Sequence, residues 1–105
     1  FSTSCYKDGF LYGYDLASLS CISAKDGSRK WKKRGFGKGT LILVGDKLVI
    51  LSDRGKLALA EINSDAYTEI STFQALEGKC WTAPTYANGY LYIRNLSQIA
   101  CYKIN

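Results

Sequence analysis

The sequence predicts an all-β fold built from repeated units of four short strands, and three observations lead to this prediction. The chain of 105 residues holds eight tyrosines, four phenylalanines and two tryptophans but a single proline, a composition that favours strands. Apolar runs of four to six residues alternate with turn segments rich in Asp, Asn and Gly. The third observation is that the chain repeats itself.

The repeat is visible when residues 1–25 are laid without a gap over residues 81–105. A middle copy occupies residues 43–62, with a turn at Gly45 and Asp46. The period is therefore about 40 residues. The identical positions of the first and third copies include Tyr6 with Tyr86, Gly9 with Gly89, Leu11 with Leu91, Tyr12 with Tyr92, Leu16 with Leu96, and Cys21 with Cys101.

Each apolar run predicts a strand, because no window of ten or more residues sustains apolar positions at helical spacing. Four short strands in about 40 residues is the period of a β-propeller blade. The sequence therefore predicts about two and a half four-stranded antiparallel blades in one partial domain: blade 1 at about residues 1–37, blade 2 at about 38–80 and an incomplete blade 3 at about 81–105. The expected strands are residues 2–7, 10–15, 19–24 and 29–34, then 39–44, 47–52, 56–62 and 67–74, and finally 82–86, 90–94 and 98–103.

The segment CISAKDGSRKW, residues 21–31, resembles the tryptophan-docking motif of quinoprotein-like (pyrroloquinoline-quinone-type) propeller repeats. In that motif a strand ends in Ala, a turn containing Gly follows, and a Trp of the outer strand packs between blades. Ala24, Gly27 and Trp31 match it, whereas Ser23 and Asp26 stand where the family has Asp and Thr. Residues 80–104 resemble the closing blade of bacterial noncatalytic members of this family, which adds Trp81 as a blade-docking residue.

The resemblance implies a noncatalytic scaffold that is the C-terminal part of a longer propeller. Its expected partners are the remaining blades or copies of itself, and its expected location is the periplasm or the cell exterior. No cofactor is expected, because catalytic quinoproteins would have adjacent cysteines, which this chain lacks. The alternative is that the chain belongs to a quinone- or metal-dependent oxidoreductase whose active site lies in absent blades.

The residues themselves also argue against an enzyme. The chain has no histidine, so a Ser-His-Asp triad cannot be built within it. Its aspartates fall in or beside predicted turns, where turn formation accounts for them. The four cysteines contain no C-x-x-C pair, which argues against a zinc site and leaves three disulfide pairings or free thiols open. Cys21 and Cys101 are expected to be buried core thiols, and Tyr12, Tyr86, Tyr90 and Tyr92 are expected to pack between sheets.

The net charge of +5 comes from one local cluster in residues 25–38, so it does not predict a nucleic-acid partner. Two interpretations of the cluster remain open: lysines that protect an edge strand from pairing, and a site for anionic groups. The glycines that follow do not have phosphate-loop spacing, and no apolar run approaches the length of a membrane span. The candidate anion-binding residues are Arg29 and Lys33, on the Trp31 face of the strand, and Lys30, Lys32 and Arg34 on the other.

An incomplete ring of blades would leave apolar faces in water at both ends. We expect Phe1, Tyr6 and Tyr12 to be exposed at one end, and Trp81, Tyr86 and Tyr92 at the other. The sequence therefore predicts a dimer or larger assembly, with Trp31 and Trp81 substantially buried.

Overall fold

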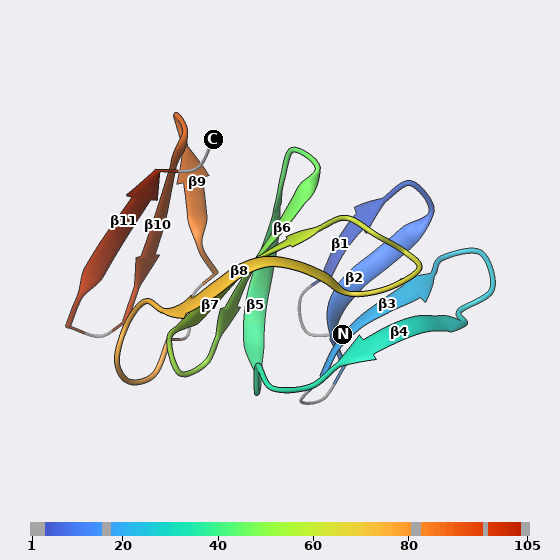
Figure 1. The fold of residues 1–105 in the computed structure, drawn as a ribbon, viewed down its shortest axis with the longest axis horizontal. Helices are drawn as coiled ribbons and strands as arrows, with labels where there is room; N and C mark the ends of the chain where they lie inside the picture. Colours follow the sequence, from blue (N-terminus) through green and yellow to red (C-terminus); the bar gives the residue numbers. More distant parts are fainter. Residues whose placement is uncertain (1–3, 16–17, 81–82, 96, 104–105) are drawn as a thin grey trace.

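The structure is a computed structural model that describes residues 4–15, 18–80, 83–95 and 97–103. These residues form eleven β-strands and no helix, arranged in three antiparallel sheets of four, four and three strands (Figure 1). The predictions of an all-β chain, of four-stranded antiparallel units and of a third unit with three strands are confirmed. Sheet 1 contains β1 (Ser4–Lys7), β2 (Phe10–Asp15), β3 (Ser18–Ser23) and β4 (Arg29–Lys33). Sheet 2 contains β5 (Gly39–Val44), β6 (Lys47–Ser52), β7 (Lys56–Glu61) and β8 (Thr68–Gln74). Sheet 3 contains β9 (Thr85–Ala87), β10 (Tyr90–Arg94) and β11 (Ile99–Lys103).

The strand boundaries follow the expected ranges closely, with the largest difference at β9. A strand over residues 82–86 was expected, but β9 begins at Thr85. Pro84 immediately precedes it and has no backbone N–H to donate to a ladder, so pairing starts after the proline.

Tight turns set the register of the hairpins at the start of sheets 1 and 3. Asp8 and Gly9 both have positive φ angles, of 51° and 88°, and so do Asn88 and Gly89, of 53° and 83°. Positive φ at both central residues is the requirement of a type I′ turn, whose twist matches that of paired strands. The turns therefore place Lys7 opposite Phe10 and Ala87 opposite Tyr90, and the two hairpins have the same register.

The sheets follow one another along the longest dimension of the molecule, which measures 41 × 27 × 19 Å (Figure 1). One hydrophobic core lies between sheets 1 and 2, and a second lies between sheets 2 and 3. The first contains Tyr12, Trp31, Leu48 and Ile50, and the second contains Val49, Leu51, Leu91 and Ile93. Sheet 2 is therefore covered on both faces, and its central strand β6 is buried from Leu48 to Ser52.

Equivalent rows of residues face the next sheet in the chain, and we call them forward rows. In sheet 1 the forward row pairs across the strands at Cys5, Tyr12, Cys21 and Trp31, and it packs on sheet 2. The opposite faces carry backward rows, which face the preceding sheet. The forward row is Ile42, Val49, Leu59 and Ser71 in sheet 2, and Thr85, Tyr92 and Cys101 in sheet 3. The backward row is Tyr6, Leu11 and Ile22 in sheet 1, Leu43, Leu48 and Ala60 in sheet 2, and Tyr86, Leu91 and Tyr102 in sheet 3.

Gly39 at the start of β5 is a position where Tyr14 of sheet 1 lies close to the backbone of sheet 2. A Cβ atom added there would overlap the carbonyl oxygen of Leu51 and lie 2.7 Å from the hydroxyl of the buried Tyr14. The backbone oxygen belongs to the paired strand β6, so it cannot move aside without breaking the ladder.

We predict that Gly39→Ala lowers the free energy of unfolding by about 1–3 kcal/mol, because it overpacks this contact. Urea denaturation followed by circular dichroism measures the change. Lys38→Ala, at the neighbouring exposed position, is the control and should stay within about 0.5 kcal/mol of the parent. Equal stability of the two variants would contradict the tight approach.

Candidate interaction surfaces

The turn between β3 and β4 is held together by backbone hydrogen bonds within sheet 1. The amide of Gly27, at φ 76°, donates to the carbonyl of Ser23 at 2.8 Å, and the amide of Ser23 donates to the carbonyl of Ser28 at 2.8 Å. The amide of Ala24 donates to the carbonyl of Gly9 at 3.0 Å, in the neighbouring hairpin turn. Ala24 and Gly27, two of the expected docking residues, therefore orient the strand that carries Trp31.

Asp26 supports the same turn through its carboxylate. The oxygen Oδ1 accepts hydrogen bonds from the backbone amide of Ser28 at 3.0 Å and from the Ser28 hydroxyl at 2.7 Å. These two bonds, the backbone one first, hold the pKa of Asp26 below its ordinary value. Asp26 is thus an ionised turn residue, as the sequence analysis expects of the aspartates.

Trp31 connects sheet 1 to sheet 2. Its side chain is 9% exposed, which confirms the expected burial, and its indole Nε1 donates to the backbone carbonyl of Asn63 at 2.7 Å. Asn63 lies in the loop between β7 and β8. The indole ring also lies against Tyr12 and Tyr67, with ring centroids 6.1 and 5.7 Å away. Trp81, the other expected docking residue, lies outside the described residues.

Two lysines form cation–π contacts with aromatic rings at this joint. The Lys33 ammonium lies 5.6 Å from the centre of the Tyr67 ring, and the Lys56 ammonium lies 4.7 Å from the centre of the Phe36 ring. Tyr67 itself contacts Phe36, at 6.1 Å between ring centroids. Burial raises the pKa of Tyr67, so its hydroxyl stays protonated and donates to Glu69 at 2.9 Å. Cation–π contacts therefore border the joint between sheets 1 and 2.

The basic cluster lies along β4, which is the edge strand of sheet 1. Four of the five candidate anion-binding residues are on this strand, and Arg34 directly follows it. All five are exposed: Arg29, Lys30, Lys32, Lys33 and Arg34. The contact of Lys33 with Tyr67 places it on the Trp31 face, as expected. The structure brings the five cations together on one open edge.

Two further surfaces are the end faces of the row of sheets. Tyr6, in the backward row of sheet 1, is 63% exposed. On the forward face of sheet 3, Tyr92 is 42% exposed and Ile99 is 77% exposed. Both faces carry large apolar side chains in contact with water, as expected for Tyr6 and Tyr92. Tyr86 is exposed as well, but it lies in the backward row of sheet 3, and Phe1 lies outside the described residues.

Three expectations about burial are wrong. Cys101 is exposed, because its forward row has no following sheet among the described residues, whereas the equivalent Cys21 is buried against sheet 2. Tyr12 was expected at an exposed end but is 1% exposed, since its row faces sheet 2, and burial raises its pKa to about 12. The third error concerns inter-sheet packing, which is confirmed for Tyr12 but not for Tyr86, Tyr90 and Tyr92, each of which is about 40% exposed.

The cysteines of the described residues form no disulfide. All four cysteines are free thiols, and burial raises the pKa of Cys5, Cys21 and Cys80, which makes them poor nucleophiles. No three His, Cys, Asp or Glu side chains of the described residues gather closely enough to hold a metal ion. None of these residues forms a helix long and apolar enough to cross a membrane.

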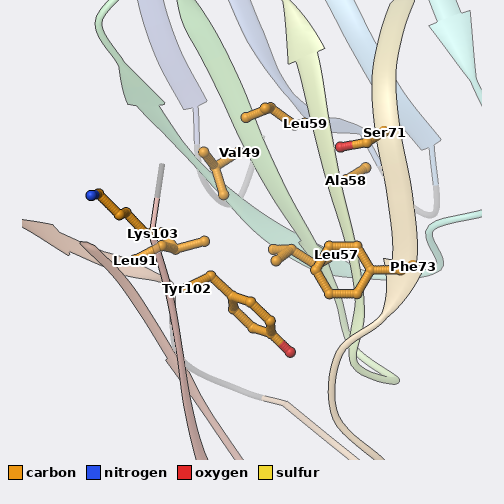
Figure 2. A pocket seen from close by; sticks show the side chains of 9 residues that line it. All are labelled: Val49, Leu57, Ala58, Leu59, Ser71, Phe73, Leu91, Tyr102 and Lys103. Atoms are coloured by element: carbon orange, nitrogen blue, oxygen red, sulfur yellow. The ribbon is translucent and has the colours of Figure 1, made fainter. Parts of the chain in front are cut away.

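A pocket of about 240 Å³ between sheets 2 and 3 was missed by the sequence analysis (Figure 2). It lies over the forward row of sheet 2, at Val49, Leu59 and Ser71. Ser71 pairs with Leu59 as Trp31 pairs with Cys21, so the serine takes the place of the docking tryptophan. Alignment of the repeats could not show that Ser71 and Trp31 are equivalent, because the loop between β7 and β8 (residues 62–67) is longer than the loop between β3 and β4 (residues 24–28).

Comparison with known proteins shows the fold alone. No protein-family model matches the chain, and no curated protein matches it. Among solved structures, the computationally designed Ika8 protein matches with a TM-score of 0.73 at 11% identity, over 96% of this chain and 32% of that one. The computationally designed Ika4 protein matches with a TM-score of 0.74 at 11% identity, over 97% of this chain and 64% of that one. The chain thus spans about a third of the first structure and just under two thirds of the second.

We predict that Trp31→Ala lowers the free energy of unfolding by about 3–5 kcal/mol, because it removes the largest side chain of the joint. Trp31→Phe keeps a ring but leaves the Asn63 carbonyl without its donor, which should cost about 1–3 kcal/mol. Urea denaturation gives both values. The exposed neighbour Lys32→Ala serves as control, and a Trp31→Ala variant as stable as this control would show that the tryptophan does not hold the sheets together.

Proposed function

We propose that this chain is a noncatalytic structural and interaction segment of a quinoprotein-like β-propeller, whose end faces pack on further blades or on copies of itself. The observation that carries the proposal is the repeated use of the same two rows. The forward row of sheet 1 packs against sheet 2, and the forward face of sheet 2 packs against sheet 3. Three successive sheets stacked by one rule are what a propeller requires.

The two end faces are complementary in position. The free face of sheet 1 carries Tyr6, Leu11 and Ile22, which is a backward row, and the free face of sheet 3 carries Tyr92 and Cys101, which is a forward row. Inside the chain, forward rows pack on backward rows. The same contact between the end faces would be head-to-tail, and such contacts close into rings when their rotation permits.

The exposed side chains supply a driving force for that contact. Tyr6, Tyr92 and Ile99 leave large apolar surfaces in water, and burying apolar surface is favourable by about 25 cal/mol per Å². The fold neighbours agree with a longer assembly, since this chain covers only part of each. The packing of Trp31 across a sheet joint agrees with the docking motif on which the family resemblance rests.

The basic strand fits this proposal without an anionic partner. β4 is an edge strand, and lysines on an edge prevent it from pairing with other chains. β11 is also at an edge and offers a second route of association, the addition of a strand beside it. An assembly test must therefore separate face packing from strand addition.

The test is light scattering on residues 1–105 at micromolar concentration, where we predict a dimer or larger assembly. Tyr6→Lys and Tyr92→Lys each place a charge on one end face and should each give a monomer, because burying an unpaired charge is unfavourable. Thr72→Lys, at an exposed position of β8, is the control and should assemble like the parent.

Mixing the two variants identifies the geometry. Tyr6→Lys keeps the sheet 3 face and Tyr92→Lys keeps the sheet 1 face, so the mixture should form a heterodimer that neither variant forms alone. A monomeric parent would contradict the proposal. Assembly that persists in both single variants would indicate strand addition at β11 and would contradict face packing.

A further inference from the structure

The joints on the two sides of sheet 2 are filled differently. At the first joint, the forward row of sheet 1 ends in Trp31, whose indole ring lies between Tyr12 and Tyr67. At the second joint, the equivalent row of sheet 2 ends in Ser71, a small and exposed side chain. A hollow of about 240 Å³ therefore lies at the place where the first joint has an indole.

The walls of this pocket are largely apolar (Figure 2). Val49 and Leu57 of sheet 2 are buried, and Leu91 of sheet 3 closes the opposite side. The rings of Phe73 and Tyr102 meet edge to face, with centroids 5.2 Å apart and planes at 70°. Phe73 and Tyr102 thus contact each other and form one aromatic wall of the hollow, whereas Tyr12 and Tyr67 at the first joint each contact Trp31.

Few polar groups line the pocket. The Tyr102 hydroxyl donates to the carbonyl of Ala75 at 3.5 Å, which leaves its oxygen able to accept a hydrogen bond. The Ser71 hydroxyl is a second polar group, and Lys103 lies at the sheet 3 side. The Lys103 ammonium points away from the hollow, because Lys103 alternates with Tyr102 along β11, so the pocket presents no charged group to a ligand (Figure 2).

The size of the pocket limits the ligand. An apolar cavity of about 150 Å³ holds a single benzene ring, and sites for drug-sized molecules begin at about 300 Å³. A pocket between these limits has room for one or two fused rings. We propose that the pocket between sheets 2 and 3 binds a small, flat, uncharged aromatic molecule of the size of indole. This inference does not depend on the proposed scaffold function.

Indole itself is the probe. Titration into the parent protein, followed by carbon–proton NMR of the methyl groups, should give saturable shifts at Val49, Leu57, Leu59 and Leu91. Ser71→Trp should fill the pocket from within, raise the melting temperature by about 4 °C or more and weaken indole binding at least tenfold. Thr72→Trp is the matched control: its side chain leaves β8 on the opposite face, so indole binding should stay within about twofold of the parent.

Three results would overturn the proposal. The first is the absence of saturable methyl shifts up to the solubility limit of indole. The second is a set of shifts centred on the methyl groups of Ile99, on the open face of sheet 3, instead of on the pocket. The third is equal indole affinity of the Ser71→Trp and Thr72→Trp variants. If Ser71→Trp does not fold, the methyl shifts of the parent decide alone.

Discussion

The packing of Trp31 between sheets 1 and 2 is the interaction on which the arrangement of this molecule depends. Each sheet has two apolar faces, and a single sheet cannot keep both from water. Trp31 covers the forward face of sheet 1 by reaching from an edge strand to the Asn63 carbonyl in the loop between β7 and β8, with Tyr12 and Tyr67 on its sides. Its hydrogen bond and ring contacts join sheet 1 to sheet 2, and sheet 2 in turn presents Val49 and Leu59 to sheet 3.

The second joint repeats this plan without its tryptophan. Leu91 and Ile93 are buried against sheet 2, but Ser71 leaves a hollow beside them. Missing contacts in such a hollow weaken the packing of the groups around it. Sheets 1 and 2 should therefore behave as one stable unit, and sheet 3 should separate from them at a lower cost. A joint that is weaker and open to solvent is also the one with room for a ligand.

Local features of the sequence were enough to predict the strands, because turn residues act locally. Asp8, Gly9, Asn88 and Gly89 adopt the positive φ angles that their side chains permit, and the hairpins follow. Local features could not predict which side chains of the first and last sheets are buried. Tyr12 and Tyr92 are equivalent in sequence, yet one is buried and the other exposed, because only the first has a sheet opposite its face.

Some of the candidate sites could be predicted from the sequence, and others could not. The position of Trp31 followed from the resemblance of its motif, and the exposure of the basic strand followed from its charge. The pocket was not predictable, because loops of different length conceal the equivalence of Ser71 and Trp31, which strand pairing reveals.

Native-state hydrogen exchange tests the central claim most directly, since it reports the free energy needed to expose each amide. The Tyr92→Lys variant suits the measurement, because it blocks packing on the open face of sheet 3 and leaves both internal joints intact. Amides of β2, β3 and β6 should exchange with one common free energy, that of global unfolding, and amides of β10 should exchange with a smaller one. Equal or greater protection of β10 would contradict a structure organised around the Trp31 joint.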